Sequence, residues 1–322
     1  MNKSVRKTTW RLLQAIILGL IFYFLGKQIY TNWDLVSAFH WEINYFWLGA
    51  AMLSVIITFF LFSSVWKLIA KSLGKDIRFL ASFKIAYLAN LGRYIPGKIW
   101  QIFGMIYLAK KEGMTEEESV ASFGLSQIFA IPSGLLSGLL FLGLYPQVYE
   151  NYSYSSRATA GLIGVAVMIF AISLSVIFFP SPIEKTANRL LKFIKRRPIK
   201  FGMNKSLAAV IYGGYFLSWS MYGLSFWLFL KGITTQEALL FPMAGIFIIA
   251  YQIGYLMLFA PGGLGPREAV MEIMLAPFFG AGVATAIAIT ARLWLIMAEA
   301  ISALIALTIK STEKTSDKVK NK

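Results

Sequence analysis

The sequence predicts an all-α, polytopic membrane protein with about six spanning helices and two helical hairpins that enter and leave on the same side. Composition is the first reason, since hydrophobic residues make up 57% of the 322-residue chain and charged residues 14%, with a mean hydropathy of +0.65. The second reason is length. Several runs without a charged residue exceed the roughly 20 residues that cross a bilayer core, among them residues 45–66, 119–149, 158–183 and 206–230. The third is a proline-glycine break in each half of the chain, at Pro96 and at Pro261.

The apolar stretches place the helices in order. In the first half they are residues 10–30, 44–70, a broken pair at 77–94 and 99–108, and 119–144, the last with Pro132 as a tolerated kink. In the second half they are residues 158–179, 206–230, a broken pair at 236–259 and 266–279, and 282–309. The basic N-terminus resembles a signal sequence, but no small-residue cleavage site follows, so we expect a retained first helix.

The two broken regions determine the topology. Segments 99–108 and 266–279 are short for full crossings, which favours re-entrant hairpins; two crossings in each region, giving eight or more spans, are the alternative. Lys and Arg gather at the N-terminus, in residues 181–205 and in the tail, and are absent from residues 30–45. Cytoplasmic connections carry the excess of positive charge, so both termini are expected in the cytoplasm and the loop 145–154 outside. The two hairpins then open from opposite sides, as in an inverted repeat.

We therefore expect one integral membrane domain over residues 1–309 in the cytoplasmic membrane, followed by a disordered basic cytoplasmic tail over residues 310–322. Residues 181–205 interleave basic and apolar side chains, which suits either an amphipathic helix on an anionic lipid surface or a plain orienting loop. The acidic residues 116–118 are expected to cap the helix that follows them. Lys84 is expected to be solvated near the inner surface.

The sequence disfavours several classes of function. The net charge of +16 lies in the segments between the spans, where it sets orientation, so we do not expect a nucleic-acid partner. The chain has no cysteine, and its one histidine, His40, falls in a predicted outer loop. It contains no His-Glu-x-x-His zinc motif, no phosphate-binding Walker loop and no Gly-x-Ser-x-Gly elbow. We therefore predict no catalytic residues, no metal and no cofactor.

The breaks supply the residues of a candidate anion site. A helix that starts inside the membrane presents unpaired N–H groups and a partial positive charge, and guanidinium groups add charge-assisted hydrogen bonds. A lipid headgroup with a phosphate fits this chemistry. The predicted headgroup-binding residues are Arg93, Pro96, Gly97, Lys98, Gly262, Gly263, Gly265 and Arg267. The alternative is that Arg93 and Lys98 only reach the inner surface while the prolines and glycines turn the chain.

Ionisable residues inside apolar stretches form a second candidate group. Glu268 and Glu272 share one helix face, and Arg292 and Glu299 share another. An isolated charge would be costly there, so we expect Arg292 to pair with one of these glutamates. The four residues then form a gating or coupling group, or their pairing is purely structural.

At the two breaks the sequence resembles the flippase-like transmembrane domain of lysylphosphatidylglycerol synthetases, also called multiple peptide resistance factors. The resemblance rests on residues 92–98, Gly-Arg-Tyr-Ile-Pro-Gly-Lys, with Trp100, and on residues 261–265, Pro-Gly-Gly-Leu-Gly, with Arg267 and Glu268. It implies the flipping or transport of an anionic lipid, such as a phospholipid, an aminoacyl-phospholipid or a polyprenyl-phosphate. Membrane lipids with an anionic headgroup are then the expected partners.

The resemblance also bears on enzymatic activity. Because the chain ends soon after its last predicted helix, we expect a stand-alone member without the soluble aminoacyl transferase domain, and we do not expect an enzyme. The sequence leaves open whether the protein has a lipid-synthesising or glycosyltransferase partner and whether it forms an oligomer. Two other classes are alternatives: an integral-membrane lipid-modifying enzyme similar to lysylphosphatidylglycerol synthase, and a membrane scaffold that transports nothing.

Overall fold

The described part of the protein is built of helices. The computed structural model describes residues 30, 33–38, 41–94, 99–145, 156–193, 197–257, 260–263 and 265–310. Within these ranges it contains α-helices and 3₁₀ turns and no strand, which confirms the predicted all-α class. The predicted first helix up to residue 29, His40, the outer loop from residue 146 and the tail from residue 311 lie outside the described residues.

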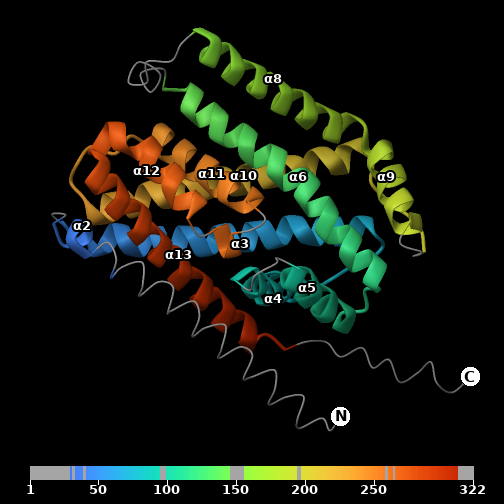
Figure 1. The fold of residues 1–322 in the computed structure, drawn as a ribbon. Coiled ribbons are helices and arrows are strands. Elements are labelled where there is room, and N and C mark those ends of the chain that lie inside the picture. The colour runs from blue at the N-terminus through green and yellow to red at the C-terminus, as the bar shows by residue number, and fades with distance from the viewer. Residues whose placement is uncertain are drawn as a thin grey trace, which may run out of the picture.

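Two series of helices share the same order of elements. The first is α3 (Tyr45–Ser72), α4 (Phe79–Asn90), the 3₁₀ turn η1 (Leu91–Tyr94), α5 (Ile99–Lys111) and α6 (Glu116–Gly143). The second is α10 (Lys205–Ile233), α11 (Leu240–Leu256), the 3₁₀ turn η2 (Pro261–Gly263), α12 (Pro266–Phe279) and α13 (Ala281–Thr308). Before the first series lies α2 (Trp33–Ala38), and between the two lie α8 (Ser156–Phe178) and α9 (Pro180–Phe193). Each series has a long helix, two short helices separated by a 3₁₀ turn, and a second long helix (Figure 1). Except for the first helix, which lies outside the described residues, the helix positions confirm those expected from the apolar stretches.

Three described helices are both long and apolar enough to cross a membrane. They are α3, α6 and α13, each with 28 residues, and α8 with α9 adds a fourth if this bent pair counts as one span. The 29-residue α10 has sufficient length but is not among the helices that meet both criteria. The expectation of about six spans is therefore supported in part, by three or four of the described helices.

α3 and α10 form an antiparallel pair through the centre of the molecule. At one end the amide of Asn44 donates to the carbonyl oxygen of Gly232 (2.9 Å), and at the other the amide of Gly202 donates to that of Ser72 (2.6 Å). The start of α3 therefore lies beside the end of α10, and the end of α3 lies beside the start of α10. Because α4 follows α3 and α11 follows α10, the two broken segments begin at opposite ends of this pair (Figure 1).

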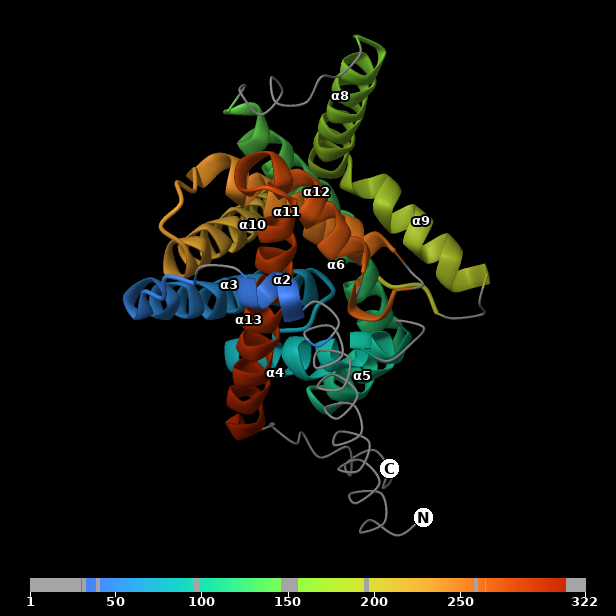
Figure 2. The same cartoon turned by 60° about the vertical axis from the view of Figure 1, so that its left-hand side comes forward.

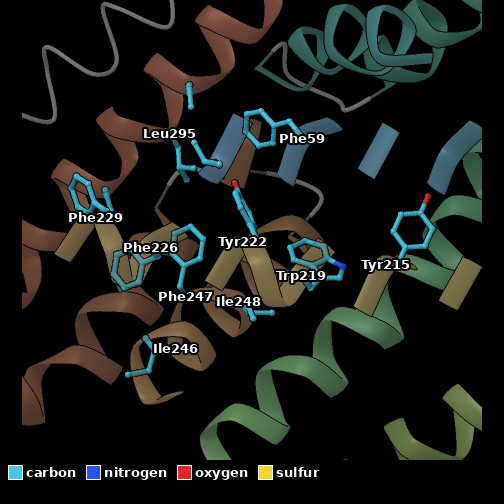
Figure 3. Packing of buried hydrophobic residues seen from close by; sticks show 14 of the residues in the cluster. Phe59, Tyr215, Trp219, Tyr222, Phe226, Phe229, Ile246, Phe247, Ile248 and Leu295 are labelled. Carbon is cyan, nitrogen blue, oxygen red and sulfur yellow. The ribbon is translucent and has the colours of Figure 1, made fainter. Parts of the chain in front are cut away.

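Aromatic side chains fill the space between α10, α11 and α13. The rings of Phe226 and Phe247 stack with centroids 4.6 Å apart, and Phe229 stacks on Trp294 at 4.9 Å. Tyr222, on the same helix as Phe226, packs edge-on against Phe247 at 5.0 Å (Figure 3). Ring pairs of this kind contribute about 0.5–1.5 kcal/mol beyond the apolar area that they bury. This packed core holds the second broken segment against α10.

Charged side chains stabilise helix ends. The start of α6 has the expected cap: the amide of Glu118 donates to the Thr115 hydroxyl (3.2 Å), and the amide of Thr115 donates to the Glu118 carboxylate (2.7 Å). Lys84 differs from the expectation, since it is half-buried and its Nζ donates to the carbonyl oxygen of Ile309 (2.5 Å). That carbonyl follows the end of α13, where unpaired acceptors and a partial negative charge attract cations.

α8 lies at the edge of the molecule (Figure 2) and contacts α6 and α10. Its apolar side chains face outward, with Val167 62% and Phe170 52% exposed, as expected for a helix that contacts lipid. α9 bends away from α8 by 86° and carries Lys185, Arg189 and Lys192. Residues 181–193 of the basic segment are therefore helical, as one of the two alternatives expected, whereas residues 197–204 are not. The place of this helix on a lipid surface stays a prediction.

Candidate functional site

The two 3₁₀ turns meet inside the protein, although they lie in different halves of the chain. η1 contacts η2, and a Cβ atom on Gly262 would lie 3.0 Å from both the Tyr94 ring and an Nη atom of Arg292. Gly262 and Gly263 have φ angles of 59° and 73°, values that glycine adopts at little cost. The glycines of the second break thus let its backbone approach the first.

Arg93 of η1 is bound through both Nη atoms of its guanidinium group. One donates to the hydroxyl of Tyr251 on α11 (2.8 Å); the other donates to the Tyr94 hydroxyl (3.3 Å) and forms an ion pair with Glu299 of α13. The Tyr94 hydroxyl in turn donates to the second carboxylate oxygen of Glu299 (2.6 Å). Since Arg93 and Glu299 are both buried, this charge-assisted network fastens the tip of the first broken segment to α13.

A second ion pair lies at the start of α12. Nη1 of Arg292 on α13 is 3.7 Å from a carboxylate oxygen of Glu268, which confirms that Arg292 pairs with a glutamate. The other oxygen of Glu268 accepts a hydrogen bond from the Gly265 amide (2.7 Å), as in a helix capping box. Arg292 also lies over the Tyr94 ring, 5.7 Å from its centroid. Glu272, one turn further along α12, is half-buried and has no ion pair within the described ranges.

Arg267 differs from the other two arginines. Among the described residues, no carboxylate lies within ion-pair distance of its guanidinium group, although the residue is only 3% exposed. Its guanidinium carbon lies 4.8 Å from the ring centroid of Tyr251 and 5.1 Å from that of Phe247, and one Nη atom has no hydrogen-bond partner. Gly254 of α11 packs closely here, because a Cβ atom on it would lie 2.7 Å from the Cβ of Arg267.

The buried group therefore carries more positive than negative charge. Three arginines, at positions 93, 267 and 292, face two buried glutamates, at positions 268 and 299. A guanidinium group stays protonated in proteins, and burying one without a counterion is expensive. The arrangement suits an anion with oxygen acceptors beside Arg267.

Two cavities meet at this group. The smaller encloses about 330 Å³ and is lined by Arg93, Gln101, Tyr251, Gly254, Tyr255, Gly262, Gly263 and Arg267. The larger encloses about 1000 Å³, its open mouth included, and shares Arg93, Gln101, Tyr251 and Tyr255 with the smaller. Residues from both breaks thus form the wall of the smaller cavity.

The structure brings together some of the predicted site residues and not others. Arg93, Gly262, Gly263 and Arg267 line the smaller cavity. Gly265 is exposed at the start of α12. The remaining predicted residues of the first break, Pro96, Gly97 and Lys98, lie outside the described residues.

Sequence reasoning missed the two tyrosines that bind Arg93. Tyr94 stands beside Arg93 in the first motif, so that motif offered a signal for it. Tyr251 lies on a mainly apolar helix that also carries Gln252 and Tyr255, so nothing in the sequence singled it out. No group of three or more His, Asp or Glu side chains that could hold a metal ion occurs in the part of the chain that the structure describes.

Fold and site together define a helical membrane protein with a buried, net-positive polar group between two broken helices. The family model for the lysylphosphatidylglycerol synthase TM region matches residues 11–299, and the chain belongs to this family. No curated protein and no solved structure matches the chain. Membership of this family indicates a role connected with membrane lipids.

Proposed function

We propose that the protein translocates an anionic lipid between the leaflets of the cytoplasmic membrane, with Arg267 binding the phosphate of its headgroup. The observation that carries this proposal is the state of Arg267, which is buried without a carboxylate partner among the described residues. A phosphate oxygen accepts charge-assisted hydrogen bonds from a guanidinium group. An anionic headgroup would therefore supply the counterion that the protein itself does not provide there.

The placement of the broken segments supports a transport mechanism by alternating exposure. They begin at opposite ends of the α3–α10 pair, and their 3₁₀ turns contact each other. A shift of one segment then opens the site toward one leaflet while the other keeps it closed. We further propose that the two series are related as an inverted repeat, with both termini in the cytoplasm and about six spans in total.

The two ion pairs have different parts in this proposal. Arg93 and Glu299 hold η1 on α13 through a well-bonded network. Arg292 and Glu268 are farther apart, at 3.7 Å, and Nε and Nη2 of Arg292 have no hydrogen-bond partner. Arg292 lines neither cavity, so these free donors would reach a second phosphate oxygen only if the pair loosened when the headgroup binds. Lys98, with Pro96 and Gly97, would receive the headgroup from the cytoplasmic side.

A reconstitution experiment tests the proposal. The full chain is placed in phosphatidylcholine liposomes that contain a trace of fluorescent phosphatidylglycerol, and the fraction bleached by an external reductant is followed over time. The wild-type chain should expose the inner-leaflet probe, and Arg267→Gln should abolish this because the phosphate loses its binding cation.

The matched control is Arg78→Gln, which removes an exposed arginine outside the site and should translocate like the wild type. Translocation by Arg267→Gln at the wild-type rate would contradict the site. Failure of the folded wild-type chain to move phosphatidylglycerol or any other anionic phospholipid would contradict the proposed function.

A further inference from the structure

The larger cavity is lined by amide and aromatic side chains that have no part in the binding of a phosphate at Arg267. It shares Arg93, Gln101, Tyr251 and Tyr255 with the smaller cavity, so a ligand held at Arg267 extends naturally into it. The space in it that the centre of a water molecule can occupy is about 180 Å³, more than ten times the roughly 10–15 Å³ that one water needs. A phosphate alone would leave most of this space empty.

Neutral amide side chains are the first distinctive feature of the wall. Asn90, Gln101, Gln127 and Gln252 all line the cavity, far more amide groups than an apolar helix bundle needs. Gln101 donates to Asn90 (3.1 Å), and Gln127 accepts from the Tyr255 hydroxyl (2.7 Å). Each amide carries both donors and acceptors, so further capacity for both remains. A hydroxyl group, itself both donor and acceptor, is the natural complement.

Three polar atoms of the wall are buried without a hydrogen-bond partner among the described residues, and one of them is Nε of Arg93. The other two are the indole Nε1–H of Trp66 and the Oε1 atom of Gln252, residues that are 3% and 1% exposed. Leaving such atoms unsatisfied costs stability. Apart from Nε of Arg93, one donor and one acceptor of the wall are thus unpaired, and a ligand in the same cavity would bind them after a local shift of the side chains.

The rest of the wall includes aliphatic side chains, the charged pair of Arg93 and Glu299, and aromatic rings, among them Trp219, Tyr222 and Tyr251. Their flat apolar faces match the C–H faces of a ring-shaped polyol, while the amides match its hydroxyl rim. A cationic headgroup fits less well, because three buried arginines already exceed two buried glutamates nearby. An acyl chain fits poorly too, since it would leave the Oε1 atom of Gln252 and the remaining donors and acceptors of the other amides without partners.

From these observations we infer that the larger cavity binds a neutral cyclic polyol, a sugar or an inositol ring, that is attached to the phosphate of the translocated lipid. The inference rests on the proposed function, because it places the phosphate of the same headgroup at Arg267. Trp66 and Gln252 would donate to and accept from the hydroxyl groups of the ring. The preferred lipids would then be glycosyl- or inositol-phosphate lipids rather than simple phosphatidylglycerol.

The test compares two short-chain lipids of equal charge, dihexanoyl phosphatidylinositol and dihexanoyl phosphatidylglycerol, titrated into the purified full chain in detergent. The wild-type chain should bind the inositol lipid about tenfold more tightly, the effect of one or two added hydrogen bonds. Trp66→Phe and Gln252→Met keep the shape of the wall and each remove one of its unpaired polar atoms. Both should bring the affinity ratio of the two lipids toward one.

The matched control is Trp294→Phe. Trp294 is also buried with an unpartnered Nε1, but it does not line the cavity, so its replacement should leave the ratio unchanged. Equal affinity of the wild-type chain for both lipids would overturn the inference and leave the proposed function standing. An unchanged ratio in Trp66→Phe and Gln252→Met would overturn it as well. Binding of neither lipid would contradict the proposed function itself.

Discussion

In the first broken segment, Arg93 has an ion pair with Glu299 and donates hydrogen bonds to two tyrosine hydroxyls. After the second, Arg267 is buried as deeply but lies between the faces of two aromatic rings, with no carboxylate partner among the described residues. Both arginines stand beside a proline-glycine break, and both line the same cavity.

The difference shows that a shared motif need not give a shared role. The protein gives Arg93 a counterion, Glu299, and two tyrosine hydroxyls as acceptors, so that side chain fixes the geometry of the tip, and among the described residues only its Nε has no partner. It leaves Arg267 with a charge that an external anion can balance. Substitutions at the two positions should therefore separate stability from lipid binding, and the following predictions are ordered by the size of the expected effect.

Glu299→Gln should have the largest effect on stability. It leaves Arg93 buried without its counterion, and breaking a buried pair from one side costs about 3–5 kcal/mol. Denaturation of the purified protein in detergent measures the loss. The double variant with Arg93→Gln should recover part of it, and Glu272→Gln, at a half-buried carboxylate without an ion pair in the described ranges, should change little. Equal losses of stability in Glu299→Gln and Glu272→Gln would contradict the view that Glu299 is needed as the counterion of Arg93.

Arg267→Met should not lower the stability of the protein. It removes a buried charge, and no carboxylate among the described residues loses its ion-pair partner as a result. The melting temperature should stay constant or rise, while the affinity for phosphatidylglycerol should fall tenfold or more, as expected when charge-assisted hydrogen bonds of about 1.5–3 kcal/mol are lost. Arg93→Met, which strands Glu299, is the comparison and should melt earlier. If Arg267→Met melts earlier too, its charge has an internal partner after all.

Gly263→Ala tests the close approach of the second tip. Its φ angle of 73° and the carbonyl oxygen of Gly254, which would lie 2.8 Å from the new Cβ, together predict a loss of about 1–3 kcal/mol. Gly265 has a φ angle of 90° but no atom within 4 Å of such a Cβ, so Gly265→Ala isolates the backbone strain, about 1–2 kcal/mol. Thermal melts of both variants should rank Gly263→Ala lower; the reverse order would argue against tight packing at the tip.

Thr115→Ala should have the smallest effect. The hydroxyl caps the start of α6, and losing such a cap costs about 1 kcal/mol. Because the cap lies outside both cavities, lipid affinity should not change. A fall in affinity would mean that global stability, and not the local charge at Arg267, controls binding in this series.

Much of the fold could be predicted from the sequence, because helix position follows from local runs of apolar residues. The meeting of the two breaks was also foreseeable, since similar interruptions recur in both halves. The ion-pair partners of the buried arginines could not be predicted from the sequence. Arg292 and Glu299 share a helix face, but only the packing of α13 against η1 and α12 decides that Glu299 binds Arg93 and Arg292 binds Glu268.

The unpaired state of Arg267 was equally hidden. Glu268 follows it directly in the sequence, yet neighbours on a helix point in different directions, and Glu268 turns to Arg292 and the Gly265 amide. The free atoms of Trp66 and Gln252 depend on which helices surround them. Such features arise from tertiary packing and leave no local pattern.

The lipids that copurify with the protein test the central claim most directly. Mass spectrometry of the wild-type chain and of Arg267→Gln, prepared from the same cells, compares bound lipid with bulk membrane lipid. We predict that an anionic phospholipid or polyprenyl-phosphate is enriched on the wild-type chain and returns to its bulk proportion on the variant. Identical lipid profiles on the two proteins would contradict an anion site at Arg267.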